Sequence, residues 1–252
     1  MPHPLDGVRE RLERANENIL ILHKEISTFL QDGADPVIPN DEPGAIQEAV
    51  ESHTDRVMPL RFSILSGEII HHLRSCLDHV AWELSSADQR ARHPTRVEFP
   101  IYVSKPVDKG EITRYERKVE GISGPGRKLI EAIQPYNRSP AILTGPQADP
   151  LWIIHEMDTT DKHRELVLTA ATFDIRTQGM MESLWLMLYR EADFPEREIV
   201  GLGRSFDPNS KVTTQVSFRE FGGRKIQPVI PGLSKLTRYV DRIVRVFADE
   251  CF

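Results

Sequence analysis

The sequence predicts an α+β protein: a bundle of long amphipathic helices packed with a C-terminal antiparallel sheet and a final helix. Apolar residues recur at steps of three and four over the first thirty residues and again over 60–87, which indicates helices. From residue 166 the pattern changes to the alternation typical of strands, and helical spacing returns over 231–252. Because helices and strands follow in blocks, α+β is favoured over α/β.

Composition limits the class of protein further. The chain has 252 residues with 32 lysines and arginines against 38 acidic residues, so its net charge of −6 gives no global attraction for nucleic acid. We expect one domain over 1–252, with a mainly helical part at 1–164, a β-rich part at 165–230 and the last helix at 231–252. Only two cysteines occur and no apolar run is long enough for a membrane span, which predicts a cytoplasmic protein.

The first two helices are the clearest elements. An apolar seam runs from Leu5 to Phe29, and Gly33 is expected to end that helix. Residues 33–45 contain three prolines and read as a loop, whereas 46–57 has no decisive pattern. The second helix is expected from about Leu60 to Ala87.

The middle of the chain predicts shorter elements. After a polar turn at 86–95, residues 97–103 are β-rich, but Pro100 suits an edge strand or an extended connector. Helices are expected at 109–119 and 125–133. Asp149 followed by Pro150 is an N-cap and first-turn pair, which predicts a helix that runs to about Arg164.

Strands are expected in the β-rich part. The five candidates are 166–175, 183–190, 197–204, 211–220 and 225–230. In the fourth, Val216 and Phe218 alternate with Gln215 and Ser217, so the first pair should face the core and the second pair solvent. Gly222-Gly223 is expected to form a hairpin turn.

The second helix carries two rows of polar side chains beside its apolar stripe. With Leu73 at the buried centre and about 100° per residue, each row lies on one flank of that stripe. One flank holds Glu68, His72, His79 and Glu83, and the other holds Gly67, His71, Arg74 and Asp78.

The same helix contains the pattern R-x-x-x-x-H, from Arg74 to His79. This resembles the signature of HEPN proteins, helical bundles many of which are metal-independent ribonucleases. The resemblance implies that His79 exchanges a proton with the RNA 2′-hydroxyl or the leaving oxygen, while Arg74 stabilises the phosphate. Asp78 or Asp161 is the candidate to orient the imidazole. The sequence departs from the HEPN signature in two ways: Ser75 follows the arginine, and Arg74 lies deep in the helix and not near its start.

A broader set of motifs is similar to a group of uncharacterised bacterial proteins. The motifs are Leu73-Arg74-Ser75-Cys76-Leu77-Asp78-His79-Val80-Ala81-Trp82, Phe99-Pro100-Ile101, Gln134-Pro135-Tyr136 and Asp161-Lys162-His163-Arg164. The resemblance implies no activity, but it nominates residues that surround one site.

The helix at 150–164 supplies the candidate substrate-binding residues. His155, Asp158 and Lys162 continue the apolar stripe inward, which is unusual for polar groups. Because buried polar groups need partners, we expect this helix to pack on the second and to bring its polar residues close to Arg74 and His79. The candidates are Asp158, Asp161, Lys162, His163 and Arg164.

Metal binding is the alternative chemistry. Glu68, His72 and His79 share one flank and could contribute nitrogen and oxygen ligands to a metal or small-ligand site. No HExxH or paired Glu-x-x-His motif occurs, so we expect neither a metal nor another cofactor.

The last helix carries a basic stripe of Lys235, Arg238, Arg242 and Arg245, and residues 201–252 hold nine basic and five acidic side chains. Arg238 and Arg242 are therefore candidates to hold RNA. The function that we predict is metal-independent RNA cleavage or RNA binding, and the alternative is a non-catalytic helical interaction protein. The long apolar seams make a homodimer plausible. No membrane partner is expected.

Overall fold

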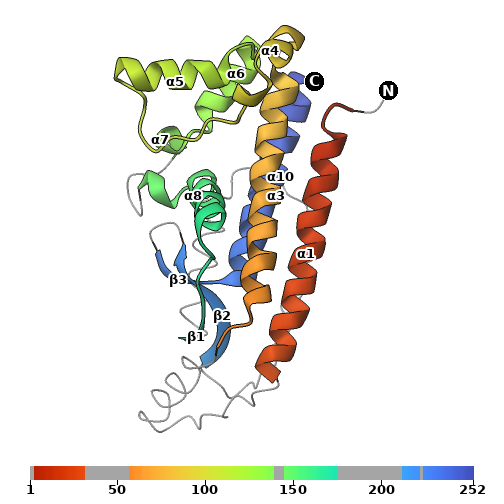
Figure 1. The fold of residues 1–252 in the computed structure, drawn as a ribbon, viewed down its shortest axis with the longest axis vertical. Coiled ribbons are helices and arrows are strands. Elements are labelled where there is room, and N and C mark those ends of the chain that lie inside the picture. Colours follow the sequence, from red (N-terminus) through yellow and green to blue (C-terminus); the bar gives the residue numbers. More distant parts are fainter. Residues whose placement is uncertain (1–2, 32–56, 139–144, 175–211, 222–223) are drawn as a thin grey trace.

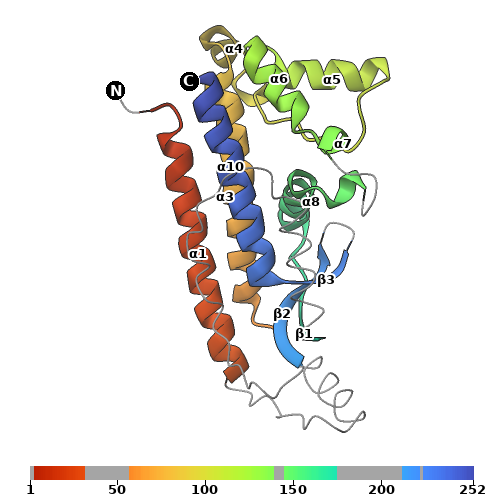
Figure 2. The ribbon, with the colours of Figure 1, turned by 180° about the vertical axis from the view of Figure 1, so that it is seen from behind.

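The computed structural model describes residues 3–31, 57–138, 145–174, 212–221 and 224–252. It has the predicted α+β architecture. Three long helices run side by side: α1 (Asp6–Gln31), α3 (Leu60–Leu84) and α10 (Val229–Cys251). Figure 1 shows them along the long axis of the molecule, and Figure 2 shows α10 in front of α3.

The apolar seams that predicted these helices form the core. Val8, Leu12 and Leu22 of α1 are buried, as are Leu73 and Leu77 of α3. Burial of such side chains is the main term that holds the helices together. Because the seams are occupied by contacts inside the chain, they offer no free surface for a second copy, and the homodimer stays a prediction.

The second helix ends earlier than predicted. α3 stops at Leu84 instead of Ala87 because Ser85 is extended and forms an isolated bridge with Ile122. The Ser86 side chain then accepts a hydrogen bond from the backbone N–H of Gln89 and begins a separate short helix, α4 (Ala87–Arg92). The polar stretch 86–95 is thus mostly helical, since the single turn η1 (Pro94–Arg96) follows.

A connector and three helices form a cap at the end of the bundle beside the C-terminus (Figure 1). Residues 97–103 form no strand and are the extended connector. The cap helices are α5 (Lys109–Val119), α6 (Gly124–Ala132) and the short α7 (Pro135–Arg138), which confirms the two helices expected there. Phe99 in the connector is fully buried and meets Phe247 of α10 edge to face.

The helix α8 (Pro150–His163) follows the single turn η2 (Pro146–Ala148) and packs across α3. In Figure 1 it is seen nearly end-on, whereas α1, α3 and α10 run lengthwise. The Asp149 carboxylate accepts a hydrogen bond from the N–H of Leu151, which confirms the predicted N-cap. The position of α8 brings its buried face against the middle of α3.

The sheet has the order β1-β2-β3, and both pairs are antiparallel. Its strands are β1 (Leu168–Asp174), β2 (Val212–Phe221) and β3 (Arg224–Pro228). Val216 and Phe218 are buried as predicted, but Ser217 is buried too. The expectation of a solvent-facing Ser217 was therefore wrong, because this central strand is covered on both faces at that residue. The strands expected at 183–190 and 197–204, the turn at Gly222-Gly223 and most of 46–57 lie outside the described residues.

Within the described ranges, no helix combines the length and the apolar character that crossing a bilayer requires.

Candidate functional site

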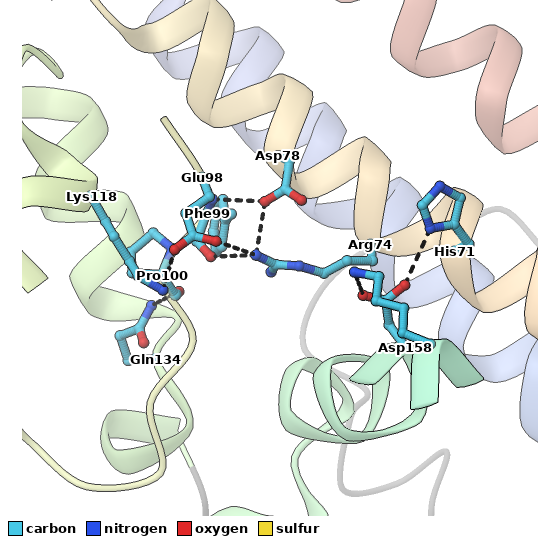
Figure 3. A network of polar contacts seen from close by, with 10 residues as sticks. His71, Arg74, Asp78, Glu98, Phe99, Pro100, Lys118, Gln134 and Asp158 are labelled. Atoms are coloured by element: carbon cyan, nitrogen blue, oxygen red, sulfur yellow. Dashed lines mark hydrogen bonds and ion pairs between the residues drawn. The ribbon is translucent and has the colours of Figure 1, made fainter. Parts of the chain in front are cut away.

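Arg74 and Asp78 grip the backbone of the connector. Arg74 Nη2 donates to the Phe99 carbonyl at 2.9 Å, and the Phe99 N–H donates to Asp78 Oδ1 at 2.9 Å. The two side chains also form an ion pair at 2.8 Å, one helical turn apart. Arg74 is only 7% exposed. We call these three residues the clamp (Figure 3).

Gln134 repeats this arrangement on the other side of the connector. Its Nε2 donates to the Pro100 carbonyl at 2.9 Å, and its Oε1 accepts from the Tyr102 N–H at 3.0 Å. Gln134 is fully buried. The motifs around Arg74, Phe99-Pro100 and Gln134 therefore meet, and their contacts fix the cap to α3.

The clamp is electrostatically crowded. Burial raises the pKa of Asp78 although the Arg74 charge and the Phe99 N–H both act to lower it. Glu98 lies 4.0 Å from Arg74 and pairs with Lys118 at 2.6 Å. Arg74 Nη1 is buried and has no hydrogen-bond partner among the described residues.

One turn earlier on α3, His71 meets α8. His71 Nδ1 lies 3.3 Å from Asp158 Oδ1, and Lys162 Nζ donates to Asp158 Oδ2 at 2.5 Å. Asp158 is only 5% exposed, whereas His71 is 61% and Lys162 56% exposed. A buried carboxylate thus holds an imidazole and an ammonium group that both face solvent. We call His71, Asp158 and Lys162 the dyad site, and Figure 3 shows the contact between His71 and Asp158.

Asp161 lies beside the dyad site, against Gly67 of α3. A Cβ atom at Gly67 would occupy the place of the Asp161 carboxylate, so the carboxylate can lie this close to α3 only beside a glycine. Burial and the neighbouring Asp158 raise the pKa of Asp161, while His71 acts in the opposite direction. Its carboxylate takes no hydrogen bond from the described part of the chain.

His155 lies between the two sets, one turn before Asp158 on α8. Burial lowers its pKa, and the charges of Arg74 and Lys118 lower it further. Its ring centroid is 5.3 Å from that of Trp152. His155 is consequently a neutral, half-buried imidazole at neutral pH.

The other flank of α3 faces α1. Arg11 of α1 donates from Nε to Ser75 Oγ at 3.2 Å, and Asn18 donates to Glu68 at 3.3 Å. Burial is the main cause that lowers the pKa values of His72 and His79, and Arg11 lowers both further. Histidines 72 and 79 therefore lie within the field of an arginine from the first helix.

The predicted site residues lie in four places. Arg74, Asp78, Asp158, Asp161 and Lys162 come together where α3, α8 and the connector meet, which confirms that α3 packs on α8. His79 leaves α3 on the flank that faces α1, and its electrostatic neighbours are Arg11, Asp78 and Glu83.

His163 and Arg164 are exposed at the end of α8. Arg238 is exposed and Arg242 is partly exposed on α10, a helix that supplies no residue to the dyad site.

The alternative metal set is not assembled. Among the residues that the structure describes, no group of three or more His, Cys, Asp or Glu side chains could hold a metal ion. Glu68 and His79 are eleven residues apart on one helix, about 16 Å along its axis, so they cannot bind the same ion. Glu68 instead accepts the hydrogen bond from Asn18.

Sequence reasoning placed His71 on the correct flank but did not select it as a site residue. The available signal was its position three residues before Arg74, on the flank that also carries Gly67 and Asp78. Arg11 was missed altogether, because nothing in the sequence pairs the first helix with Ser75.

No protein-family model, curated protein or solved structure matches the chain.

Proposed function

We propose that the dyad site carries out metal-independent cleavage of RNA, with His71 as the group that moves the proton. The observation that carries this proposal is that buried Asp158 binds both His71 and Lys162 while their outer faces stay exposed. An imidazole held by a carboxylate is a common arrangement for proton transfer near neutral pH. An ammonium group fixed beside it supplies the positive charge that a phosphodiester in reaction requires.

The reaction needs two proton transfers and no metal. His71 takes the proton of the 2′-hydroxyl, the 2′-oxygen forms a bond to phosphorus, and the bond from phosphorus to the 5′-oxygen breaks. The leaving 5′-oxygen receives a proton from water, His71 returns its proton to solvent, and the products carry a 2′,3′-cyclic phosphate and a 5′-hydroxyl. Lys162 faces the phosphate oxygens and stabilises their charge, while Asp158 fixes the ring of His71.

This assignment differs from the one that the HEPN resemblance implies. That resemblance gives the chemistry to Arg74 and His79, but the contacts of Arg74 are internal, to Asp78 and the Phe99 carbonyl. A side chain that is 7% exposed can reach a phosphate only if the connector leaves it. His71 requires no such movement.

The basic stripe of α10 supplies a second reason to consider a polyanion. Arg238 and Arg245 are exposed on its outer face, although Arg245 pairs with Asp241. Since these residues lie on a helix outside the dyad site, they would hold only a longer strand. Charge reversal of Arg238 and Arg242 should then weaken binding of a long RNA and leave cleavage of a dinucleotide unchanged.

The proposal is tested with the full chain, a labelled single-stranded RNA and a divalent chelator. We expect cleavage to 2′,3′-cyclic ends, and a loss of about 100- to 10,000-fold in His71→Ala, the usual effect of removing a general base. Lys162→Ala should also slow the reaction, and Lys128→Ala, an exposed lysine of the cap helix α6, is the control with unchanged rate.

Two results would contradict the assignment. Intact RNA after long incubation with the folded wild-type protein would leave the non-catalytic interaction protein as the better reading. Cleavage that persists in His71→Ala but is lost in His79→Ala would show that Arg74 and His79, the R-x-x-x-x-H pair, are the catalytic residues.

A further inference from the structure

Arg11 crosses from α1 to the outer face of α3 without a carboxylate partner. Its Nε donates to Ser75 Oγ at 3.2 Å, and its Nη1 donates to the Gly7 carbonyl at 3.3 Å. Both acceptors are neutral, and no ion pair of Arg11 occurs among the described residues. By contrast, Arg9 and Arg14 on the same helix pair with Asp6 and Glu17.

The position of Arg11 relates it to the dyad site. Ser75, which holds it, is four residues after His71 on α3, so the two lie one above the other, about 6 Å apart along the helix axis. His72 and His79 flank Arg11 and feel its charge. His71 lies on the flank of α3 that meets α8, and Arg11 reaches Ser75, one turn further, from the flank that faces α1.

The groove between α1 and α3 is hollowed nearer the start of α3, and neither Arg11, His72, Ser75 nor His79 lines that hollow. A hollow of about 440 Å³ is lined by Arg14 and Asn18 from α1 and by Ile64 and Glu68 from α3, with four further residues. Glu68, on its wall, is four residues before His72.

We infer that Arg11, with His72 and His79 beside it, forms a phosphate-binding subsite in the α1–α3 groove that holds the phosphate next to the one at His71 and Lys162. The inference rests on the proposed function for its substrate class, RNA. Arg11 supplies a permanent positive charge and planar donors that suit a phosphate oxygen. His72 and His79 donate N–H groups to the same anion, and Ser75 positions Arg11.

Binding is measured separately from cleavage, in the His71→Ala background. A fluorescent single-stranded RNA is titrated by anisotropy at several salt concentrations. Arg11→Ala should weaken binding and reduce the slope of log K against log salt by about 0.7, the value for loss of one phosphate contact to a single strand. Arg9→Ala, a neighbouring arginine already paired with Asp6, should leave affinity and slope unchanged.

NMR of the histidine rings, in the same His71→Ala background, distinguishes RNA from free phosphate as the ligand of Arg11. RNA should shift the His72 and His79 signals, Arg11→Ala should abolish that shift, and Ser75→Ala should reduce it. Circular dichroism confirms that each variant is folded. The same shifts from inorganic phosphate at equal phosphate concentration would overturn the polymer subsite in favour of a free anion.

The failures of the two proposals differ. If RNA binds the His71→Ala protein, and adding Arg11→Ala changes neither the affinity nor the salt slope, the subsite is wrong and the proposed function is unaffected. If RNA does not bind the parent protein at all, both are wrong.

Discussion

One turn of α3 separates His71 from Arg74, and each of these side chains binds a group from another segment. In the clamp, Arg74 donates to the C=O of Phe99, Asp78 accepts from the N–H of Phe99, and the guanidinium is buried. In the dyad site, the buried group is the carboxylate of Asp158, and the two cationic side chains that it holds are exposed. The same helix flank thus presents polar residues inward at one turn and outward at the next.

This difference in burial distinguishes charged side chains that hold the fold together, in the clamp, from charged side chains that can reach a ligand, in the dyad site. A buried ion pair is costly to break, because removing one partner leaves the other desolvated. The clamp uses that cost to hold the cap on the bundle, and its charges are not available to a ligand. The dyad site buries only the group that orients, so substitutions there should affect chemistry more than stability.

The largest effect should come from Arg74→Ala. It removes the cation from the partly buried Asp78, leaves the Phe99 carbonyl without its donor and empties a buried volume, so we expect the free energy of unfolding to fall by about 3–5 kcal/mol. Urea denaturation measures this change. His71→Ala, one turn away and exposed, should change stability by less than about 1 kcal/mol.

The distinction between the clamp and the dyad site would be wrong if Arg74→Ala is as stable as the wild type and loses RNA cleavage. Arg74 would then act on the phosphate, as the HEPN resemblance implies, and the clamp would be secondary.

Gln134→Ala should have the next largest effect. It leaves the Pro100 carbonyl and the Tyr102 N–H without their side-chain partner, and unsatisfied buried polar groups cost about 1–3 kcal/mol. Hydrogen exchange at Tyr102 should accelerate more than exchange in α1, since the loss is local to the connector. Equal acceleration in both places would show that Gln134 supports the whole fold and not this connector.

Gly67→Ala tests the contact between α3 and Asp161, beside the dyad site, and should change stability less than the two substitutions above. Alanine favours the helix by about 1 kcal/mol, but its Cβ displaces the Asp161 carboxylate, so the net change should stay within about 1 kcal/mol. The displaced carboxylate reaches solvent, and its raised pKa should return toward the ordinary value in a carbon NMR titration. Gly7→Ala in α1, where a Cβ meets nothing, is the matched control.

The sequence was sufficient for elements with a clear period. α1, α3 and α10 follow from apolar residues at steps of three and four, and Asp149-Pro150 marks the start of α8 because a cap and a first-turn proline act locally. The end of α3 was misplaced by three residues because the bridge from Ser85 to Ile122 is a tertiary contact. Ser217 was misplaced for the same reason.

The site was only half predictable. The flanks of α3 followed from helical geometry, and Asp158 and Lys162 were selected because polar groups on an apolar stripe need partners. Which flank residue meets them depends on the angle at which α8 crosses α3, and no local pattern encodes that angle. The sequence therefore selected Arg74, whereas the contact with Asp158 is made by His71.

The smallest effect that we predict concerns His155, which lies between the clamp and the dyad site. Burial, Arg74 and Lys118 hold its pKa below the ordinary 6.5, against the opposing charges of Asp158 and Glu98. In the unfolded chain the imidazole binds its proton near pH 6.5, so the unfolded state takes up more protons than the folded state just below that pH. Stability contributed by neutral His155 is therefore fully present above pH 6.5 and is lost as the pH falls toward the lower folded-state pKa.

The measurement is the unfolding free energy of wild type and His155→Gln between pH 7.5 and 5. One proton contributes a slope of at most about 1.4 kcal/mol per pH unit, and the variant should lack that part of the decline. His72 and His79 have lowered pKa values of the same sign and remain in both proteins, so only the difference between the two curves reports on His155. Parallel curves would mean that His155 is solvated in solution, and the close approach of α8 to the clamp would then be wrong.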